Sequence, residues 1–335
     1  MSITAKELSQ RLGLSATAVS MALNNKPGVS TETRQTVIKA AEKYGYDFTK
    51  LSLKSKPNGC IYFILYISNN AIISYSPIFD ELTEGLVREL KKENYRMKTI
   101  HFYEKMDDMN TFLGNIRMSD CIGIILLGTE LTETTAKNFL SLSIPVVILD
   151  SYFTCLNCNY ILIDNYQGAY IATDYLITHR RQQPGHLKSS CSLHNFTERE
   201  SGFNNALKTN GMSPSHSIIH QLTPSIEGSF SDMMEILEHN TPLADCYFAD
   251  NDLIAIGVIK ALKSKGYRIP EDIGIIGFDN ISEGLIVEPS LTTINVSRIH
   301  MAEMAVRTLL NNIKNPISYT HRIQISTTLV KRLSV

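Results

Sequence analysis

Apolar residues near the start of the chain recur at helical spacing. Ala5, Leu8 and Leu12 lie three and four positions apart, which predicts one face of a short amphipathic helix. Thr4 precedes this pattern as an N-cap candidate, because its side-chain oxygen can accept a hydrogen bond from a backbone N–H of the first turn. Gly13 follows it, and glycine often ends helices because it adopts a left-handed conformation at little cost. The pattern predicts a first helix between Thr4 and Gly13.

The same signals predict two more helices within the first part of the chain. Ser15 is the N-cap candidate of a second helix that ends at Asn24, and Ser30 is that of a third helix that Gly45 ends. Three short helices with a tight turn between the first two indicate a helix-turn-helix. On this pattern alone, a three-helix module that binds another protein is the alternative.

In a helix-turn-helix, the second helix lies in the major groove of DNA, and its positions outside the apolar stripe face base edges. We expect four residues to read bases there: Ala16, Thr17, Ser20 and Met21. Hydroxyl, amide and amino groups at helix ends are suited to donate hydrogen bonds to phosphate oxygens. Three residues are expected to contact phosphate: Thr4, Asn24 and Lys26.

Basic side chains are concentrated in the same region. The whole chain has a formal net charge of -1, from 32 basic and 33 acidic residues. Residues 1–56 hold nine basic and four acidic side chains, a net charge of +5, which leaves -6 for the rest of the chain. A basic head on an acidic body is typical of a phosphate-binding module joined to a larger domain that does not bind DNA.

From residue 59 onward, strand-like apolar runs alternate with helical segments. The run IYFILYI at 61–67 predicts a buried strand, and the apolar spacing within 79–93 predicts the helix that follows it. Further strands are predicted at 97–101, 122–127, 144–150 and 161–164. This alternation is typical of a doubly wound α/β fold, in which ligands bind at the carboxyl ends of the strands.

Fixed spacings extend this interpretation to a family. The pattern G-x-S-x-x-x-V-S-x-x-L-N runs from Gly13 to Asn24 and is followed by K-P-G-V-S. This stretch resembles the DNA-binding head of the LacI/GalR family of transcriptional regulators. The body resembles the type I periplasmic-binding-protein fold that the same family uses as its effector domain. The motifs that carry this second resemblance are A-D-N-D-x-x-A-x-G at 249–257, G-Y-R-I-P-E-D-I-G-I-I-G-F-D at 266–279 and P-S-L-T-T-I at 289–294.

The resemblance implies an α/β protein with three parts. These are a helix-turn-helix DNA-binding domain at 1–46, a hinge or linker at 47–58, and a two-lobed, doubly wound domain at 59–335 for effector binding and dimerisation. In such a fold the chain would cross between the lobes three times, near 162, 290 and 323. Lobe one would then comprise about 59–161 and 291–322, and lobe two about 162–290 and 323–335.

Two departures from the family pattern bear on DNA binding. Met21 stands where the family usually has an arginine that can form two hydrogen bonds with guanine, and methionine offers only apolar contact. We therefore expect an operator that differs from the common family site. In the linker, Leu51 or Leu53 is the candidate for the leucine that the family inserts into the minor groove, and a plain flexible linker is the equal alternative.

The resemblance also implies an effector site between the lobes. Four residues match family positions that face this cleft: Asp150, Arg199, Asn251 and Asp279. Loops after the early strands add three weaker candidates: Ser68, Ser76 and His101. Carboxylate and guanidinium groups suit the hydroxyls of sugars, because each can form two hydrogen bonds at once. We therefore expect a small effector, a sugar or a sugar derivative.

Several of these charged residues also have plainer interpretations. In the alternative interpretation, Arg199 forms a surface ion pair with Glu198 or Glu200, and Asp150 and Asp279 are caps at strand ends.

Two further polar residues, Asp252 and Arg298, are left out of the predicted effector site. Asp252 is expected to cap the helix that follows Asn251. Arg298 is expected to point to solvent, with contact to an acidic or phosphorylated effector as the alternative.

The motifs of common enzymes are missing from the sequence. It contains no G-x-x-x-x-G-K-[ST], G-x-G-x-x-G, H-E-x-x-H or G-x-S-x-G, so we expect no enzyme and no cofactor. Cys155 and Cys158 form a single C-x-x-C without the second ligand pair of a structural zinc site, so no metal is expected.

Location and partners follow from the same evidence. The start MSITAKELSQ lacks the apolar core of a signal peptide, and no apolar run is long enough to span a membrane. We therefore expect a cytoplasmic repressor that forms a homodimer, binds a palindromic site in double-stranded DNA and responds to an effector. A cytoplasmic solute-binding sensor with degenerate DNA binding is the alternative.

Overall fold

The computed structural model describes residues 3–48, 57–68, 78–316 and 319–335. The chain divides into two compact units, Met1–Asn58 and Gly59–Val335, and each unit is described by itself.

The N-terminal unit consists of three helices with the caps that the sequence predicts. They are α1 (Ala5–Leu12), α2 (Ala16–Leu23) and α3 (Thr31–Lys43). Thr4 forms a reciprocal capping box with Glu7, and Ser15 and Ser30 accept hydrogen bonds from backbone N–H groups of α2 and α3. A small core holds the helices together, with six buried residues: Leu8, Val19, Ala22, Val37, Ala41 and Tyr46.

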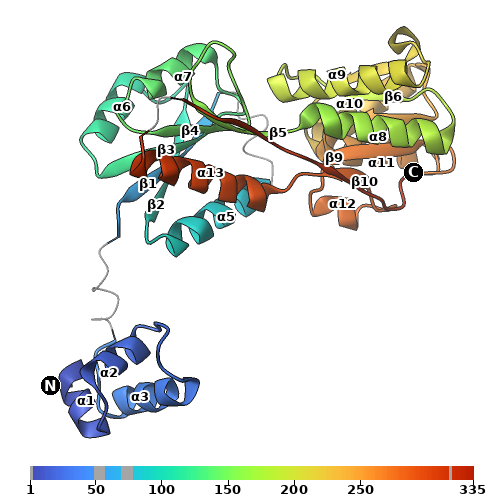
Figure 1. The fold of residues 1–335 in the computed structure, drawn as a ribbon. Helices are drawn as coiled ribbons and strands as arrows, with labels where there is room; N and C mark the ends of the chain where they lie inside the picture. The colour runs from blue at the N-terminus through green and yellow to red at the C-terminus, as the bar shows by residue number, and fades with distance from the viewer. Residues whose placement is uncertain (1–2, 49–56, 69–77, 317–318) are drawn as a thin grey trace. The chain divides into compact units, whose positions relative to one another are not determined.

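The first lobe of the larger unit is built on a six-stranded parallel sheet in the order β11-β5-β4-β3-β1-β2. Its strands are β1 (Cys60–Ile67), β2 (Arg96–Tyr103), β3 (Cys121–Leu127), β4 (Val146–Leu149), β5 (Asn159–Ile163) and β11 (Arg322–Ile325). Helices cover both faces of this sheet (Figure 1). One face packs α5 (Ile78–Lys92) and α13 (Arg298–Lys314), and the other packs α6 (Met109–Arg117) and α7 (Glu133–Leu140).

The second lobe has its own six-stranded sheet in the order β12-β10-β9-β8-β6-β7. Its strands are β6 (Gly185–Ser189), β7 (Ile219–Leu222), β8 (Cys246–Ala249), β9 (Gly274–Asp279), β10 (Thr292–Asn295) and the antiparallel β12 (Thr328–Val330). The helices are α8 (Asn165–Arg180) and α9 (His194–Thr209) on one face, α10 (Ile226–Glu238) and α11 (Asp252–Ser264) on the other, and the short α12 (Glu283–Ile286) and η1 (Pro214–His216).

The chain passes between the two sheets three times, and two of these crossings lie later than predicted. The first follows β5, where Asp164 caps α8. The second follows β10, and not residue 290, because β10 pairs with β9 in the second sheet before the chain leaves that sheet. The third follows β11, and not residue 323, because Arg322–Ile325 pairs with β5. Strand pairing, which the local pattern does not reveal, sets both boundaries.

Membrane and metal features were sought in the described ranges only. No helix there combines the length and apolar character needed to cross a membrane. Among the same residues, no group of histidine, cysteine and carboxylate side chains is arranged to hold a metal ion. Cys155 is exposed whereas Cys158 is buried, and both are free thiols.

Candidate functional site

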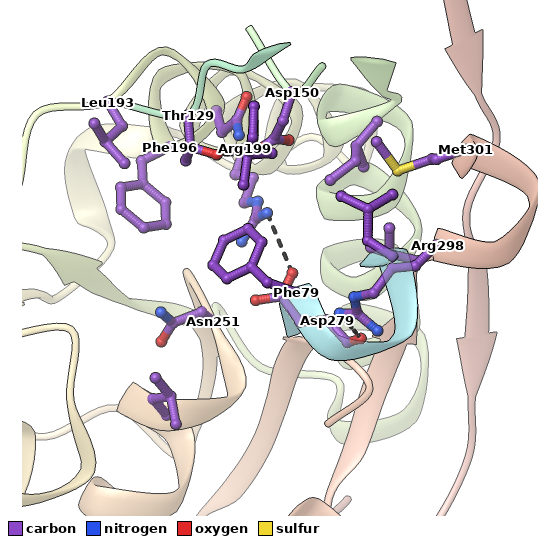
Figure 2. A pocket seen from close by; sticks show the side chains of 16 residues that line it. Phe79, Thr129, Asp150, Leu193, Phe196, Arg199, Asn251, Asp279, Arg298 and Met301 are labelled. Atoms are coloured by element: carbon purple, nitrogen blue, oxygen red, sulfur yellow. Dashed lines mark hydrogen bonds and ion pairs between the residues drawn. The ribbon is translucent and has the colours of Figure 1, made fainter. Parts of the chain in front are cut away.

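A cavity lies between the two lobes of the larger unit, and both lobes contribute to its walls (Figure 2). Its polar residues are Thr129, Asp150, Asn195, Arg199, Asn251, Asp279 and Arg298. Its apolar residues are Phe79, Leu82, Leu127, Ile163, Leu193, Phe196, Leu253, Val296 and Met301. A mostly apolar wall with a few convergent polar groups is the usual composition of a small-molecule site.

Arg199, from α9, is the central cation of this cavity. Arg199 is only 3% exposed, and its Nε donates to the side-chain oxygen of Asn165 at 2.9 Å. One terminal nitrogen donates to the backbone carbonyl of Asp250, and the other lies 3.5 Å from a carboxylate oxygen of Asp279. The guanidinium also lies 3.7 Å from the centre of the Phe278 ring. Arg199 is thus held in one position by contacts on several sides.

The surface ion pairs considered for Arg199 do not form. Glu200 binds Lys188 at 2.8 Å, and Glu198 lies 3.3 Å from His194. Arg199 instead lines the cavity (Figure 2).

Asp250, whose backbone carbonyl accepts from Arg199, is itself held in place by other residues of the second lobe. Asp250 is fully buried, and its carboxylate accepts a hydrogen bond from the Ser189 N–H at 2.7 Å and lies 2.8 Å from Nε2 of His186. The His186 ring stacks against the rings of both Phe203 and Phe248.

Two aspartates end strands on opposite sides of the cavity, and both have left-handed backbones. Asp150 follows β4 with φ 64°, and Asp279 ends β9 with φ 111°. Non-glycine residues rarely adopt such conformations, which cost of the order of 1–3 kcal/mol and cluster at ligand sites. The strained backbone directs one carboxylate from each lobe into the same space.

The cavity environment disfavours the charged form of both carboxyls. Burial raises the pKa of Asp150 to about 6, although the Thr129 hydroxyl, which donates to it at 2.6 Å, and the Arg199 charge act in the opposite direction. Burial also raises the pKa of Asp279, while the charges of Arg199 and Arg298 oppose this shift. In both groups the neighbouring cations and donors thus oppose the effect of burial without cancelling it.

The expectation that Arg298 points to solvent is wrong. Arg298 is the first residue of α13 and is buried, because the crossing from β10 brings it against the end of β9. Its Nη2 donates to the backbone carbonyl of Asp279 at 2.6 Å, and its Nη1 lies 3.5 Å from Glu81 on α5. Figure 2 shows Arg199 and Arg298 each linked to Asp279.

The expectation that Asp252 caps α11 is also wrong. The N-cap is Asn251, whose side-chain oxygen accepts from the N–H of Ile254, so Asn251 both caps the helix and lines the cavity. Asp252 is fully buried and accepts hydrogen bonds from the Thr293 hydroxyl at 2.5 Å and the Ile281 N–H at 2.9 Å. Burial raises the pKa of Asp252 to about 8.

The structure brings together four of the seven predicted effector residues, Asp150, Arg199, Asn251 and Asp279. The Ser68 hydroxyl instead donates to Glu104, away from the lining residues. His101 does not reach the cavity, because it lies exposed on the outer strand β2, where its ring stacks on Tyr103. Ser76 lies outside the described residues.

Three polar lining residues lie beyond the predicted set, namely Thr129, Asn195 and Arg298. Thr129 comes just after β3, so the rule that ligands bind at strand ends would have found it. Asn195 and Arg298 are in the first turns of α9 and α13, where no local pattern distinguishes them from surface residues.

In the N-terminal unit, three of the predicted base readers are exposed on α2, namely Ala16, Thr17 and Ser20. Met21 is half-buried, and its sulfur packs near Gly28.

The residues predicted to contact phosphate differ in whether their side chains already form hydrogen bonds within the protein. The Thr4 hydroxyl belongs to the capping box, and the Asn24 amide donates to the Ser20 carbonyl at 2.7 Å. Lys26 is exposed. Leu51 and Leu53 lie outside the described residues.

Arg34 was not predicted to have a role in this unit. Its guanidinium donates to the carbonyls of Met21, Ala22 and Lys26, at the end of α2. A cation there stabilises the helix end, and these bonds fix α2 to α3.

The fold and the cavity together define a helix-turn-helix module joined to a two-lobed ligand-binding module. Residues 4–47 match the family model described as "Bacterial regulatory proteins, lacI family". Residues 173–335 match the model described as "Periplasmic binding protein-like domain".

Curated relatives match almost the whole chain. The HTH-type transcriptional repressor PurR of Mannheimia succiniciproducens is 26% identical over 338 residues, which cover 99% of this chain and 98% of the relative. The HTH-type transcriptional regulator GalS of Salmonella typhimurium is 28% identical over 339 residues, which cover 99% and 96%.

Two solved structures share the fold. The transcriptional regulator CelR–cellobiose complex has a TM-score of 0.74 at 21% identity and covers 99% of this chain and 100% of its own. The lac repressor dimer bound to operator and the anti-inducer ONPF has a TM-score of 0.69 at 18% identity, with coverage of 100% and 99%.

The chain belongs to the LacI family of bacterial regulatory proteins. It is a DNA-binding transcriptional regulator, and the curated relatives it matches are regulators rather than enzymes.

Proposed function

We propose that this chain is a homodimeric repressor whose affinity for a palindromic operator is controlled by a sugar or a sugar derivative in the cavity. The observation that carries the proposal is the pair of inward carboxylates, Asp150 from the first lobe and Asp279 from the second, with Arg199 between them. Sugar hydroxyls both donate and accept, so they satisfy carboxylates and guanidinium groups together. The cellobiose in the CelR complex supports this ligand class.

The ligand would control the chain through the arrangement of its lobes. A molecule that touches Asp150 and Asp279 contacts both lobes at once and stabilises the arrangement in which both contacts form. Such closure is a common way in which ligand binding is coupled to a distant surface.

On the DNA side, the proposed base readers are Ala16, Thr17, Ser20 and Met21, and the proposed phosphate contacts are Thr4, Asn24 and Lys26. The exposure of Thr17 and Ser20 on α2 supports their role, because a polar side chain must extend from the protein surface to reach a base in the groove. Leu51 or Leu53 is proposed as the minor-groove wedge.

A homodimer is proposed because a palindromic site requires two heads related by two-fold symmetry. Exposed apolar residues of the larger unit support an interface between copies. Val87 on α5 and Ile299 on α13 are exposed on neighbouring helices, and Leu285 and Ile286 on α12 are 62% and 83% exposed.

One observation favours the second candidate, a sensor with degenerate DNA binding. Met21 replaces the family's guanine-binding arginine and is half-buried beside Gly28, so it offers the duplex little polar contact.

Capture of genomic DNA by the purified full-length protein separates the two candidates. The proposed function predicts recovery of a palindromic motif, and an affinity for it that falls by roughly a thousandfold between about 50 and about 200 mM salt. Recovery of fragments without a common motif, at either salt concentration, would favour the sensor.

Two matched variants sharpen this test. Thr17→Ala should weaken binding to the recovered motif, because it removes a proposed base contact from α2. Thr36→Ala is the control, because Thr36 is an exposed threonine of the same unit on α3 whose hydroxyl bonds within its own helix. Equal effects of the two variants would contradict the role of α2.

A further inference from the structure

Arg298 has a buried donor atom that the protein does not use. Its side chain is 4% exposed, and its two terminal nitrogens contact the Asp279 carbonyl and Glu81. Among the residues that the structure describes, Nε of Arg298 has no hydrogen-bond partner. A guanidinium is always charged, and leaving one of its buried donors unpaired is costly, so such an atom points to a missing acceptor.

The buried Asp252 and Asp279 carboxyls attract Arg298 electrostatically, but the ion pair that Arg298 forms with Glu81 is weak. Glu81 lies 3.5 Å away and its side chain is 63% exposed, so water screens this ion pair. The Asp279 carboxylate faces Arg199, and Arg298 takes only the backbone carbonyl of that residue. Arg298 is also the first residue of α13, whose N-cap Ser297 forms no side-chain cap bond. The positive end of the helix dipole thus adds to the charge of the guanidinium.

An unused acceptor lines the same cavity. Oδ2 of Asp150 accepts from the Thr129 hydroxyl, whereas Oδ1 is buried without a hydrogen-bond partner among the described residues. The Asn195 side chain also acts on the Asp150 carboxyl and lowers its pKa. One cavity therefore presents an unused cationic donor and an unused anionic acceptor on different elements.

We propose that the effector is a polyhydroxylated carboxylate, a sugar acid, whose carboxylate accepts from Nε of Arg298 and whose hydroxyl donates to Oδ1 of Asp150. This inference rests on the proposed function and narrows its ligand class. A neutral sugar supplies the hydroxyl but no anionic oxygen for the free Nε of Arg298. A single free Nε–H suits one carboxylate oxygen better than the dianionic phosphate of a sugar phosphate, which attracts several donors.

Calorimetric titration of the full-length protein with matched ligands tests the ligand class. The pairs are D-galacturonate with D-galactose, D-glucuronate with D-glucose, and D-gluconate with D-glucitol, and D-galactose 6-phosphate is added as the phosphorylated comparison. We expect at least one acid to bind about tenfold or more tightly than its neutral partner, the usual size of one charge-assisted hydrogen bond. Tighter binding of the neutral member or of the phosphate, or no binding of any acid, would overturn the inference.

Variants of the arginine and its partner test the contact itself. Arg298→Gln should weaken binding of the acid about tenfold or more and change binding of its neutral partner by less than about threefold. Glu81→Gln should leave acid binding unchanged or stronger, because it removes only the competing surface carboxylate. Arg307→Gln is the matched control, because Arg307 is exposed on the same helix outside the cavity. An equal loss for acid and neutral ligand in Arg298→Gln would mean a positioning role only.

Two results keep this inference distinct from the proposed function. If a neutral sugar and no acid releases the protein from its operator, the inference fails and the proposed function stands. If no operator is recovered although the acid binds the wild type and not Arg298→Gln, the repressor proposal fails and the ligand class stands. Should Arg298→Gln fail to fold, Glu81→Gln and the titrations of the wild type still decide the question.

Discussion

The two units place their candidate recognition residues in opposite environments. In the N-terminal unit, Thr17 and Ser20 stand exposed on α2, a helix fixed by a small core. In the larger unit, Arg199 and Asp279 are buried between two sheets. A DNA duplex is too large to enclose and is read from its surface, whereas a small molecule is bound tightly only when most of its surface is enclosed.

The contrast has an energetic consequence. An exposed side chain can be changed with little effect on stability, so substitutions on α2 should alter binding alone. A buried charge with several partners supports both the ligand and the fold, so substitutions in the cavity should alter both.

Arg199→Met should have the largest effect, because it leaves the buried Asp279 carboxylate without its ion-pair partner. We expect a loss of roughly 3–5 kcal/mol in the free energy of unfolding, measured by urea denaturation, and no response to effector. Operator affinity of the folded fraction should be retained. Arg268→Met, in the exposed pair with Asp272, is the control and should change little. Wild-type stability of Arg199→Met would contradict the buried network.

Leu8→Ala should destabilise the N-terminal unit and leave the stability of the larger unit unchanged. Leu8 is fully buried in a core of few side chains, so its truncation should cost about 2–5 kcal/mol in that unit. DNA binding should be lost in a gel-shift assay, while effector binding by calorimetry is unchanged. Gln10→Ala, exposed on the same helix, should retain both activities. Loss of effector binding in Leu8→Ala would show that the units do not fold separately.

Met21→Arg should change which bases are read. An arginine at this position can form two hydrogen bonds with guanine, worth about 1–3 kcal/mol of discrimination. Selection from a random DNA library should then show guanine enriched at one symmetric position in each half-site. An unchanged motif would remove Met21 from the reading positions.

A pH dependence of stability is also expected from Asp252. Burial raises the pKa of Asp252 to about 8, whereas an unfolded aspartate titrates near about 4. Between these values the folded state binds more protons than the unfolded state, so the free energy of unfolding falls as pH rises from about 4 to about 8. Asp252→Asn should reduce this slope in urea denaturation at pH 5 and pH 8. It should not abolish the slope, because burial raises the pKa of Asp150 and Asp279 as well. Identical slopes in the variant and the wild type would contradict the assignment.

The sequence by itself determined the elements whose signals are local. The caps Thr4, Ser15 and Ser30 satisfy backbone groups within three residues, so each helix start of the N-terminal unit could be predicted. Family spacing predicted that Arg199 and Asp279 share one cavity, and for Asp279, which ends β9, the order of the strands gives the reason, because it fixes which strand ends meet.

Only the tertiary structure decided which charged residues became buried. Arg298 was expected at the surface and His101 at the effector site, yet β10 carries Arg298 into the cavity while the outer strand β2 leaves His101 exposed. Asp252 is adjacent to the cap Asn251 and differs from it in its distant partners Thr293 and Ile281. Burial depends on strand pairing and on contacts between segments far apart in the chain, which spacing within a single segment does not encode.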